Sequence, residues 1–180
     1  DAGDVNILNN YTSGLVTASN VTTITGTLAD VNATYAASAT SGNAIAGLGD
    51  ESVELTDTRV LATDLVTLNT DSSGTIDASS VHSISGTGTT ITNSNDVYGS
   101  GRFTGLGSEN VTITDTGTAG NGNGAVVADL NTLNGYTTGN VDASAISFLE
   151  GTISALNTAY AAGSALGNGI SGLGNETVTI

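Results

Sequence analysis

An internal repeat constrains the fold of this chain more than any other feature. Residues 4–55 align with residues 129–180 without a gap, and 24 of the 52 aligned pairs are identical. A GLGxE motif lies near the end of each copy, at residues 47–51, 105–109 and 172–176. Repetition of this kind is typical of stacked architectures, in which each repeat packs against its neighbours in the chain.

A weaker middle copy divides the chain into three modules. Residues 65–87 match residues 5–27, and residues 104–116 match residues 46–58. The modules are therefore assigned to residues 1–60, 61–126 and 127–180, with a Gly-rich insertion at 117–124 in the second and a truncated third. The pattern predicts a single repeat domain over residues 1–180 that belongs to a longer array.

A finer period inside the module predicts the fold. Leucine or isoleucine recurs every 20 residues, at Leu8, Leu28, Leu48 and Leu68, and again at Leu133, Ile153 and Leu173. Short alternating groups such as Val53-x-Leu55 favour strands separated by turns. These observations predict an all-β parallel β-solenoid (β-helix) with coils of about 20 residues, three per module, and a rod about 40 Å long.

Two alternatives compete with this fold. A β-sandwich also uses short strands, but it does not require a constant leucine spacing. The Ala-rich segments 27–37 and 152–162 could instead form helical turns, since Leu156 and Tyr160 lie four residues apart. The second architecture is therefore a solenoid with one short helix in each module.

Composition narrows the classes of function. The formal net charge is −15, and Arg59 and Arg102 are the only strong cations. Nucleic-acid binding and attraction to anionic lipids both need clustered Lys and Arg, so neither is expected. The sequence lacks an apolar run of about 18 residues, so no membrane insertion is predicted. The hydrophobic share of 38% is enough to build a core.

The phrases TLNGYTTGNVDASAISFLEGT (132–152) and GISGLGNETVTI (169–180) resemble tandem modules of very large secreted bacterial repeat proteins, especially those of marine cyanobacteria. The resemblance implies an extracellular or cell-surface protein that is adhesin-like or layer-forming. Some relatives carry calcium-binding repeats of the GGxGxD type. The insertion at 117–124 has no Asp at that spacing, so calcium binding by this route is not predicted.

One acidic cluster is a candidate calcium site. Asp50, Glu51, Glu54 and Asp57 place four carboxylates within eight residues, and calcium prefers such oxygen ligands. The other interpretation is structural, because Glu51 recurs as Glu109 and Glu176 at the end of each GLGxE phrase. In that role the carboxylate would accept hydrogen bonds from backbone N–H groups of the turn.

The remaining polar residues predict no enzyme. Asp77 and Asp142 stand in the second and third copies at the position that Thr17 occupies in the first. An exchange of Asp for Thr favours a side chain that only hydrogen-bonds to nearby backbone. His82 and Arg102 occur once each, without the partner that a catalytic pair requires. No catalytic residue and no cofactor are predicted, with calcium as the one open candidate.

Repeated tyrosines and glycines complete the expectations. Tyr35 and Tyr160 share one module position, with Tyr98 close to it, and either fill the core or contact sugars. We expect inward-facing leucines flanked by glycines at tight bends, and buried valines two residues after each GLGxE phrase; the leucines are Leu48, Leu106 and Leu173, and the valines are Val53, Val111 and Val178.

The expected function is that of a structural extracellular repeat region: a stalk, filament or surface layer of a large cell-surface or adhesin-like protein. The alternative is a calcium- or glycan-binding module of an adhesin. The expected partners are neighbouring repeats of the same chain, further copies in end-to-end or lateral self-association, and glycans.

Overall fold

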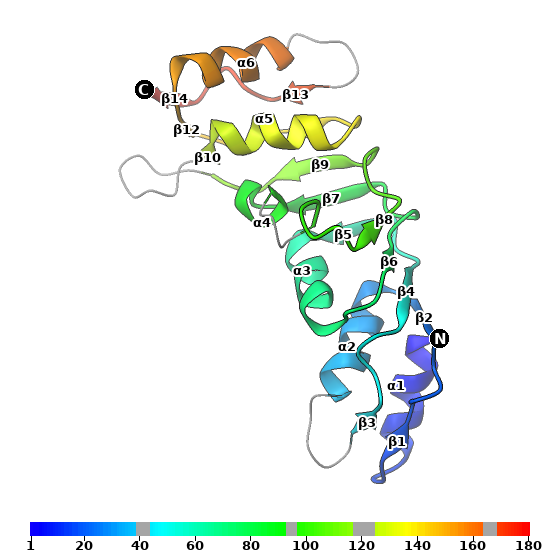
Figure 1. The fold of residues 1–180 in the computed structure, drawn as a ribbon. Helices are drawn as coiled ribbons and strands as arrows, with labels where there is room; N and C mark the ends of the chain where they lie inside the picture. The colour runs from blue at the N-terminus through cyan, green and yellow to red at the C-terminus, as the bar shows by residue number, and fades with distance from the viewer. Residues whose placement is uncertain (39–43, 93–96, 117–124, 164–168) are drawn as a thin grey trace.

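A computed structural model describes residues 1–38, 44–92, 97–116, 125–163 and 169–180. The chain forms an elongated stack of helices and parallel strands (Figure 1), and six helices hold 36% of the described residues. The helices are α1 (Ala2–Tyr11), α2 (Leu28–Ser38), α3 (Ala62–Asp71), α4 (Gly88–Thr92), α5 (Val127–Tyr136) and α6 (Ile153–Gly163).

Fourteen short strands in the described residues form four sheets, and every pairing is parallel. The first seven strands are β1 (Val16–Thr17), β2 (Thr23–Gly26), β3 (Ile45–Ala46), β4 (Ser52–Leu55), β5 (Arg59–Leu61), β6 (Ile76–Asp77) and β7 (Ser83–Gly86). The others are β8 (Phe103–Thr104), β9 (Asn110–Ile113), β10 (Ala125–Val126), β11 (Val141–Asp142), β12 (Phe148–Glu150), β13 (Ile170–Ser171) and β14 (Thr177–Thr179).

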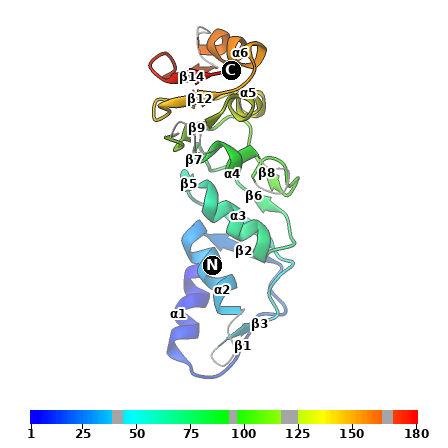
Figure 2. The same ribbon diagram turned by 90° about the vertical axis from the view of Figure 1, so that its left-hand side faces the viewer.

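The structural unit is a helix, a short strand, a corner and a second strand. Six such units follow one another, so that each 60-residue module contains two of them. The helices succeed each other in chain order along the length of the molecule (Figure 2). β5 and β10 are additional strands that precede α3 and α5.

The strand pairing changes at each module boundary. Within a module, equivalent strands of the two units pair, as Ile24 does with Val53. Between modules, the second strand of one unit pairs with the first strand of the next, through β4–β6 and β9–β11. Each module is therefore offset around the stack from the one before it, and new ladders start at β5 and β10.

The strand order rises steadily in every sheet of the described chain, for example β5-β7-β9-β11-β13. The class is mixed α/β with parallel strands, as in Rossmann-like domains. In those domains ligands bind where the strand order reverses. The described residues show no such reversal, so the fold itself points to no nucleotide crevice.

In α1, α3 and α5, an apolar residue recurs at every third position. Ala62, Leu65 and Leu68 of α3 are fully buried, and α5 repeats the pattern. Threonines fit within these helices because their hydroxyls can donate to the carbonyl four residues earlier, as Thr67 does to Thr63 at 3.0 Å.

Side-chain bonds fix each helix to its neighbour. Asn6 and Asn131 donate from Nδ2 to carbonyls of the next helix, at Asp30 and Ala155, over 2.9 Å each. Thr27 directly precedes α2, and its hydroxyl accepts a hydrogen bond from the N–H of Asp30 at 3.2 Å. These contacts lie beside one continuous core that extends from the first helix to β13.

The predicted all-β solenoid is wrong, and with it the expectation of a β-solenoid filament. The 20-residue spacing does not mark equivalent positions: Leu8 is 53% exposed on α1, Leu28 and Leu68 are buried in helices, and Leu48 lies in a loop. Paired strands are 23 to 30 residues apart instead, as in Val53–Ile76 and Val111–Val141. The reason is that helices occupy about ten residues of most units.

Helices at the two Ala-rich segments are confirmed, since α2 and α6 cover them. The second architecture nevertheless missed α1, α3, α4 and α5. The sequence signal for these missed helices was the three-residue spacing of apolar side chains, and the threonines between those side chains obscured it. The Gly-rich insertion at 117–124 lies outside the described residues.

Candidate functional site

The three GLGxE corners have the same local structure. Leu48, Leu106 and Leu173 are partly buried and pack against the core, as predicted. The glycine before each leucine has φ between 81° and 87°, in the left-handed region that favours glycine. A Cβ on Gly105 would lie 2.6 Å from the Cα of Ser79 in the preceding unit. The predicted tight bends are therefore confirmed.

The glutamate of each corner accepts backbone hydrogen bonds. Oε2 of Glu51 accepts from the N–H of Gly49 at 2.9 Å, and Oε2 of Glu109 from that of Gly107 at 2.8 Å. Glu176 does the same with Gly174 at 2.7 Å. The structural interpretation of the repeated glutamate is thus confirmed.

A tyrosine from the preceding helical segment completes each corner. The hydroxyl of Tyr35 donates to Oε2 of Glu51 at 3.0 Å, and Tyr160 donates to Oε1 of Glu176. Tyr98, which follows α4, makes the corresponding bond to Oε1 of Glu109. The described chain therefore contains three copies of a Tyr–Glu pair that fixes the helix side of a unit to its corner.

The pKa values of three of these side chains, Tyr35, Tyr160 and Glu176, are shifted. Burial raises the pKa of Tyr35 to about 12; the Glu51 carboxylate adds to the rise, and a hydrogen bond with Ser72 opposes it. Burial and the Glu176 carboxylate raise the pKa of Tyr160 to about 12. Burial by itself would raise the pKa of Glu176, but bonds from Tyr160 and the corner N–H groups outweigh it and lower that pKa.

Alkaline pH is expected to destabilise the fold through these tyrosines. The unfolded chain loses the Tyr35 proton near pH 10, whereas the folded chain keeps it until about pH 12. The stabilisation is complete below pH 10 and is lost between the two values, by about 1–2 kcal/mol for each buried tyrosine after solvent screening. Urea unfolding between pH 9 and 12 measures this slope. Tyr35→Phe should reduce this slope by the share of one tyrosine, whereas Tyr11→Phe, at an exposed position, should leave it unchanged. An equal slope in both variants would contradict the assignment.

The same corners also join one module to the next. The N–H and hydroxyl of Ser73 both donate to the carbonyl of Gly49, at 2.6 and 2.9 Å. Thr138 repeats both bonds to Gly107, at 2.8 and 3.1 Å. We call this contact the module junction, and it occurs twice in the described chain.

A glycine follows Ser73 and Thr138 at each junction. A Cβ on Gly74 would lie 2.0 Å from the carbonyl oxygen of Glu51, and one on Gly139 2.2 Å from that of Glu109. Only glycine allows the two backbones to approach this closely. Next to the second junction, the rings of Tyr98 and Tyr136 stack with centroids 5.2 Å apart.

The four candidate calcium ligands differ in burial and do not come together as one group among the described residues. Glu51 is buried at its corner, whereas Asp50 and Glu54 are exposed, and Glu54 lies on the outer face of β4. Asp57 accepts from the N–H of Leu28 at 2.6 Å, at the start of α2. Within the described residues no group of three or more potential ligands comes together, and calcium binding stays a prediction.

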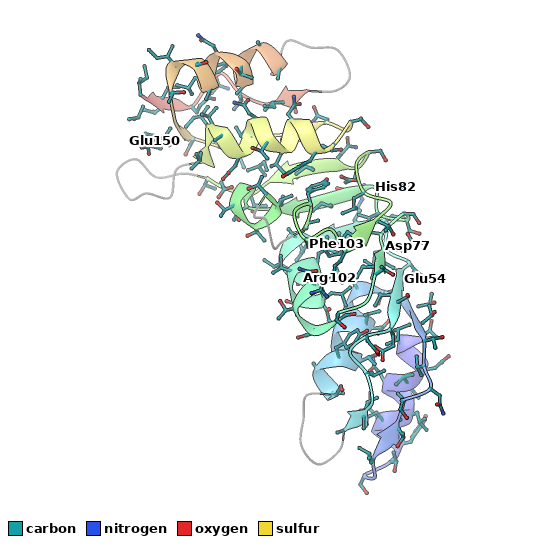
Figure 3. All side chains as sticks on the ribbon, in the orientation of Figure 1. Glu54, Asp77, His82, Arg102, Phe103 and Glu150 are labelled. Carbon is teal, nitrogen blue, oxygen red and sulfur yellow. The ribbon has the colours of Figure 1, made fainter. Side chains whose placement is uncertain are left out.

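Asp77, His82 and Arg102 lie on the middle part of the stack (Figure 3). Asp77 accepts from the N–H of Ser79 at 2.9 Å, and Asp142 from that of Ser144 at 3.0 Å, which confirms their role in local turns. The Ser79 bond lowers the pKa of Asp77. His82 is exposed, and Arg102 donates to the carbonyl of Ser72 at the end of α3.

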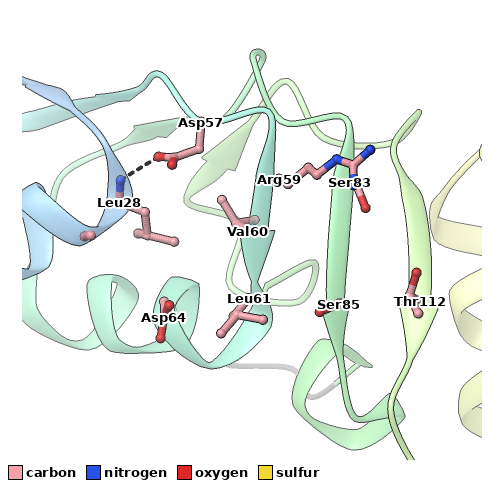
Figure 4. Close-up of a pocket in the computed structure, with 10 residues that line it drawn as sticks. Leu28, Asp57, Arg59, Val60, Leu61, Asp64, Ser83, Ser85 and Thr112 are labelled. Carbon is pink, nitrogen blue, oxygen red and sulfur yellow. Dashed lines mark hydrogen bonds between the residues drawn. The ribbon is translucent and has the colours of Figure 1, made fainter.

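A groove of about 390 Å³ lies between the first two modules (Figure 4). Arg59, Asp64 and Ser83 line it together with Val60 and the bound carboxylate of Asp57. Its polar groups come from α3, from β5, β7 and β9 and from the loop that holds Asp57, but nothing in the described residues places a base beside a nucleophile there.

The roles of two groups of residues at these sites did not follow from the sequence. Gly14, Gly74 and Gly139 were visible as matched positions, but nothing indicated that a carbonyl approaches two of them. Asp57 and Asp115 accept from the first N–H of α2 and α4, at 2.6 and 2.7 Å. The recurrence of TDT in two modules was the available signal.

No family model, curated protein or solved structure matches this chain. The resemblance to large secreted repeat proteins therefore stays an expectation. None of the described helices combines the length and the apolar character needed to cross a bilayer.

Proposed function

We propose that this chain is a structural spacer, a stalk-like or layer-building region of a large extracellular or cell-surface protein. The observation that carries the proposal is the module junction, which recurs with the same hydrogen bonds and the same glycine. A junction of fixed geometry adds length in proportion to the number of modules.

The distribution of polar groups supports this role. The corner glutamate, a charged group that recurs in all three modules, bonds to its own corner and to a tyrosine of the same module. The net charge of −15 keeps such chains soluble and makes unrelated contacts repulsive. A binding module would instead direct its repeated polar groups toward a ligand.

Small-angle scattering with and without calcium tests the spacer role. A compact domain of this length would have a radius of gyration of about 16 Å, and the stack is expected to exceed it. Adding about 1–10 mM calcium, which saturates typical extracellular calcium modules, should change neither this radius nor the unfolding temperature. A compact radius would contradict the spacer. A saturable rise in unfolding temperature with calcium would instead favour the calcium-binding alternative.

A further inference from the structure

The groove between the first two modules lies over the outer face of β5, β7 and β9 (Figure 4). Alternate side chains of these strands, such as Val60 and Ile84, are buried in the core. The side chains between them face outward and line the groove; they are Arg59, Leu61, Ser83, Ser85 and Thr112. Residues at the start of α2 and α3 border it, so two consecutive modules build the groove within this chain.

The polar side chains of the groove do not bond to their neighbours. Elsewhere on the sheets, outward polar groups bond across the strands, as Thr25 does to Glu54 at 3.3 Å and Asn140 to Ser171 at 2.8 Å. Among the described residues, four side chains of the groove have no such partner; they are Arg59, Ser83, Ser85 and Thr112. Their donors are therefore available to a ligand.

The repeat does not account for the hydroxyls of the groove. The third module has Phe148 and Glu150 at the positions that Ser83 and Ser85 occupy in the second. The fold therefore accepts a large apolar or a charged side chain at these positions. The polar lining belongs to the first module boundary and not to the repeat.

Charges of both signs lie along the groove. Arg59, one of two strong cations in a chain of net charge −15, extends toward β7, where Ser83 is its direct neighbour (Figure 4). Figure 4 shows Asp64 away from Arg59, toward Leu61, whose side chain is 53% exposed. The carboxylate of Asp57 already accepts from the first N–H of α2. A guanidinium and a carboxylate thus lie apart in one groove, with hydroxyls on the strands between and beside them.

We propose that this groove binds an acidic sugar, a hexuronate unit of a polysaccharide. The Arg59 guanidinium offers a planar fork of N–H donors that matches a carboxylate. The hydroxyls of the strands lie in a row at the strand spacing of about 4.8 Å and exchange hydrogen bonds with the sugar hydroxyls. Leu61 supplies apolar surface for the C–H face of the ring. The volume of about 390 Å³ lies within the range of small-molecule sites.

Asp64 favours an acidic sugar over other carboxylate ligands. A simple carboxylate has no donor for Asp64, which repels it, as does the net charge of −15. A neutral sugar satisfies Asp64 and the hydroxyls but leaves the Arg59 guanidinium without an anion. A hexuronate carries one acid group and several hydroxyls, so it matches both ends of the groove. This binding goes beyond the spacer role and does not depend on it.

A nuclear magnetic resonance titration of the full chain tests the site with matched probes. The methyl glycosides of glucuronate and galacturonate are compared with methyl glucoside, which lacks the acid, and with acetate, which lacks the hydroxyls. At least one uronide should bind with a Kd of about 1 mM, and methyl glucoside and acetate should bind at least about tenfold more weakly. Equal binding of acetate would indicate a general carboxylate site, open to acidic peptides, and would overturn the sugar. Equal binding of methyl glucoside would overturn the role of Arg59. No saturable binding of either uronide would overturn the proposal.

Two pairs of measurements locate the binding. Arg59→Gln should weaken uronide binding at least about tenfold and leave the unfolding temperature unchanged, because Arg59 makes no side-chain bond within the described chain. Thr112→Val should weaken it about fivefold, the value of one hydrogen bond. Thr114→Val, exposed and outside the groove, should not. Binding that survives Arg59→Gln would place the sugar elsewhere and refute the site. A chain that is elongated in scattering but binds no uronide would refute the sugar site and leave the spacer role standing.

Discussion

Gly74→Ala is expected to destabilise the fold by about 3 kcal/mol or more, the range of severe overpacking in a rigid site. The added Cβ would lie 2.0 Å from the carbonyl oxygen of Glu51, and Glu51 and Gly74 lie just before the paired strands β4 and β6, which limit how far either backbone can move. Relief requires the first two modules to separate, which breaks the bonds from Ser73 to Gly49. Urea unfolding followed by circular dichroism measures the loss.

Gly14→Ala is the matched control for this experiment, because Gly14 occupies the same position in the first module. Measured at micromolar concentration, where the chain is expected to be monomeric, it should change stability by no more than about 0.5 kcal/mol. Equal losses in the two variants would show that the glycine serves the local loop and not the junction.

Leu68→Ala is expected to destabilise the chain by about 3–4 kcal/mol, as large-to-small changes in a closed core do. Leu68 is fully buried in α3 and belongs to the core that continues from the first module into the second. The neighbouring helices are fixed by their own side-chain bonds, so the cavity cannot collapse. Thermal or urea unfolding gives the value.

Leu8→Ala tests the same leucine position in the first module, where Leu8 is exposed on α1. Its effect on the stability of the monomer should stay within about 0.5 kcal/mol. A loss comparable to that of Leu68→Ala would mean that Leu8 is buried in solution. A small loss at Leu68 would contradict the continuous core.

The corners were the part of the site that could be predicted best. GLGxE recurs three times, and glycine on both sides of a leucine indicates a bend with little room. The valines after the corner were also predicted, and Val53 and Val111 are buried. Val178 is 39% exposed, because β14 pairs on one side only within the described chain.

The helices could not be predicted with the same success. Threonine, valine and isoleucine have a local preference for strands, and they recur throughout the repeat. In α3, however, Ala62, Leu65 and Leu68 share one buried face, and burying that face outweighs the preference. The gain exists only when neighbouring helices cover the face, so it depends on contacts between units.

The sequence by itself determined that the chain repeats, that its acidic composition disfavours nucleic acid, and where the glycine corners lie. Those features are local or compositional. Only the tertiary structure decided that each module holds two α/β units. It also decided that the carboxylates of Asp50, Glu51, Glu54 and Asp57 do not come together as one group, and that the backbone of Gly74 lies against the carbonyl of Glu51. The physical reason is distance along the chain: the register between units joins residues 23 to 30 positions apart, and packing across that distance selects it.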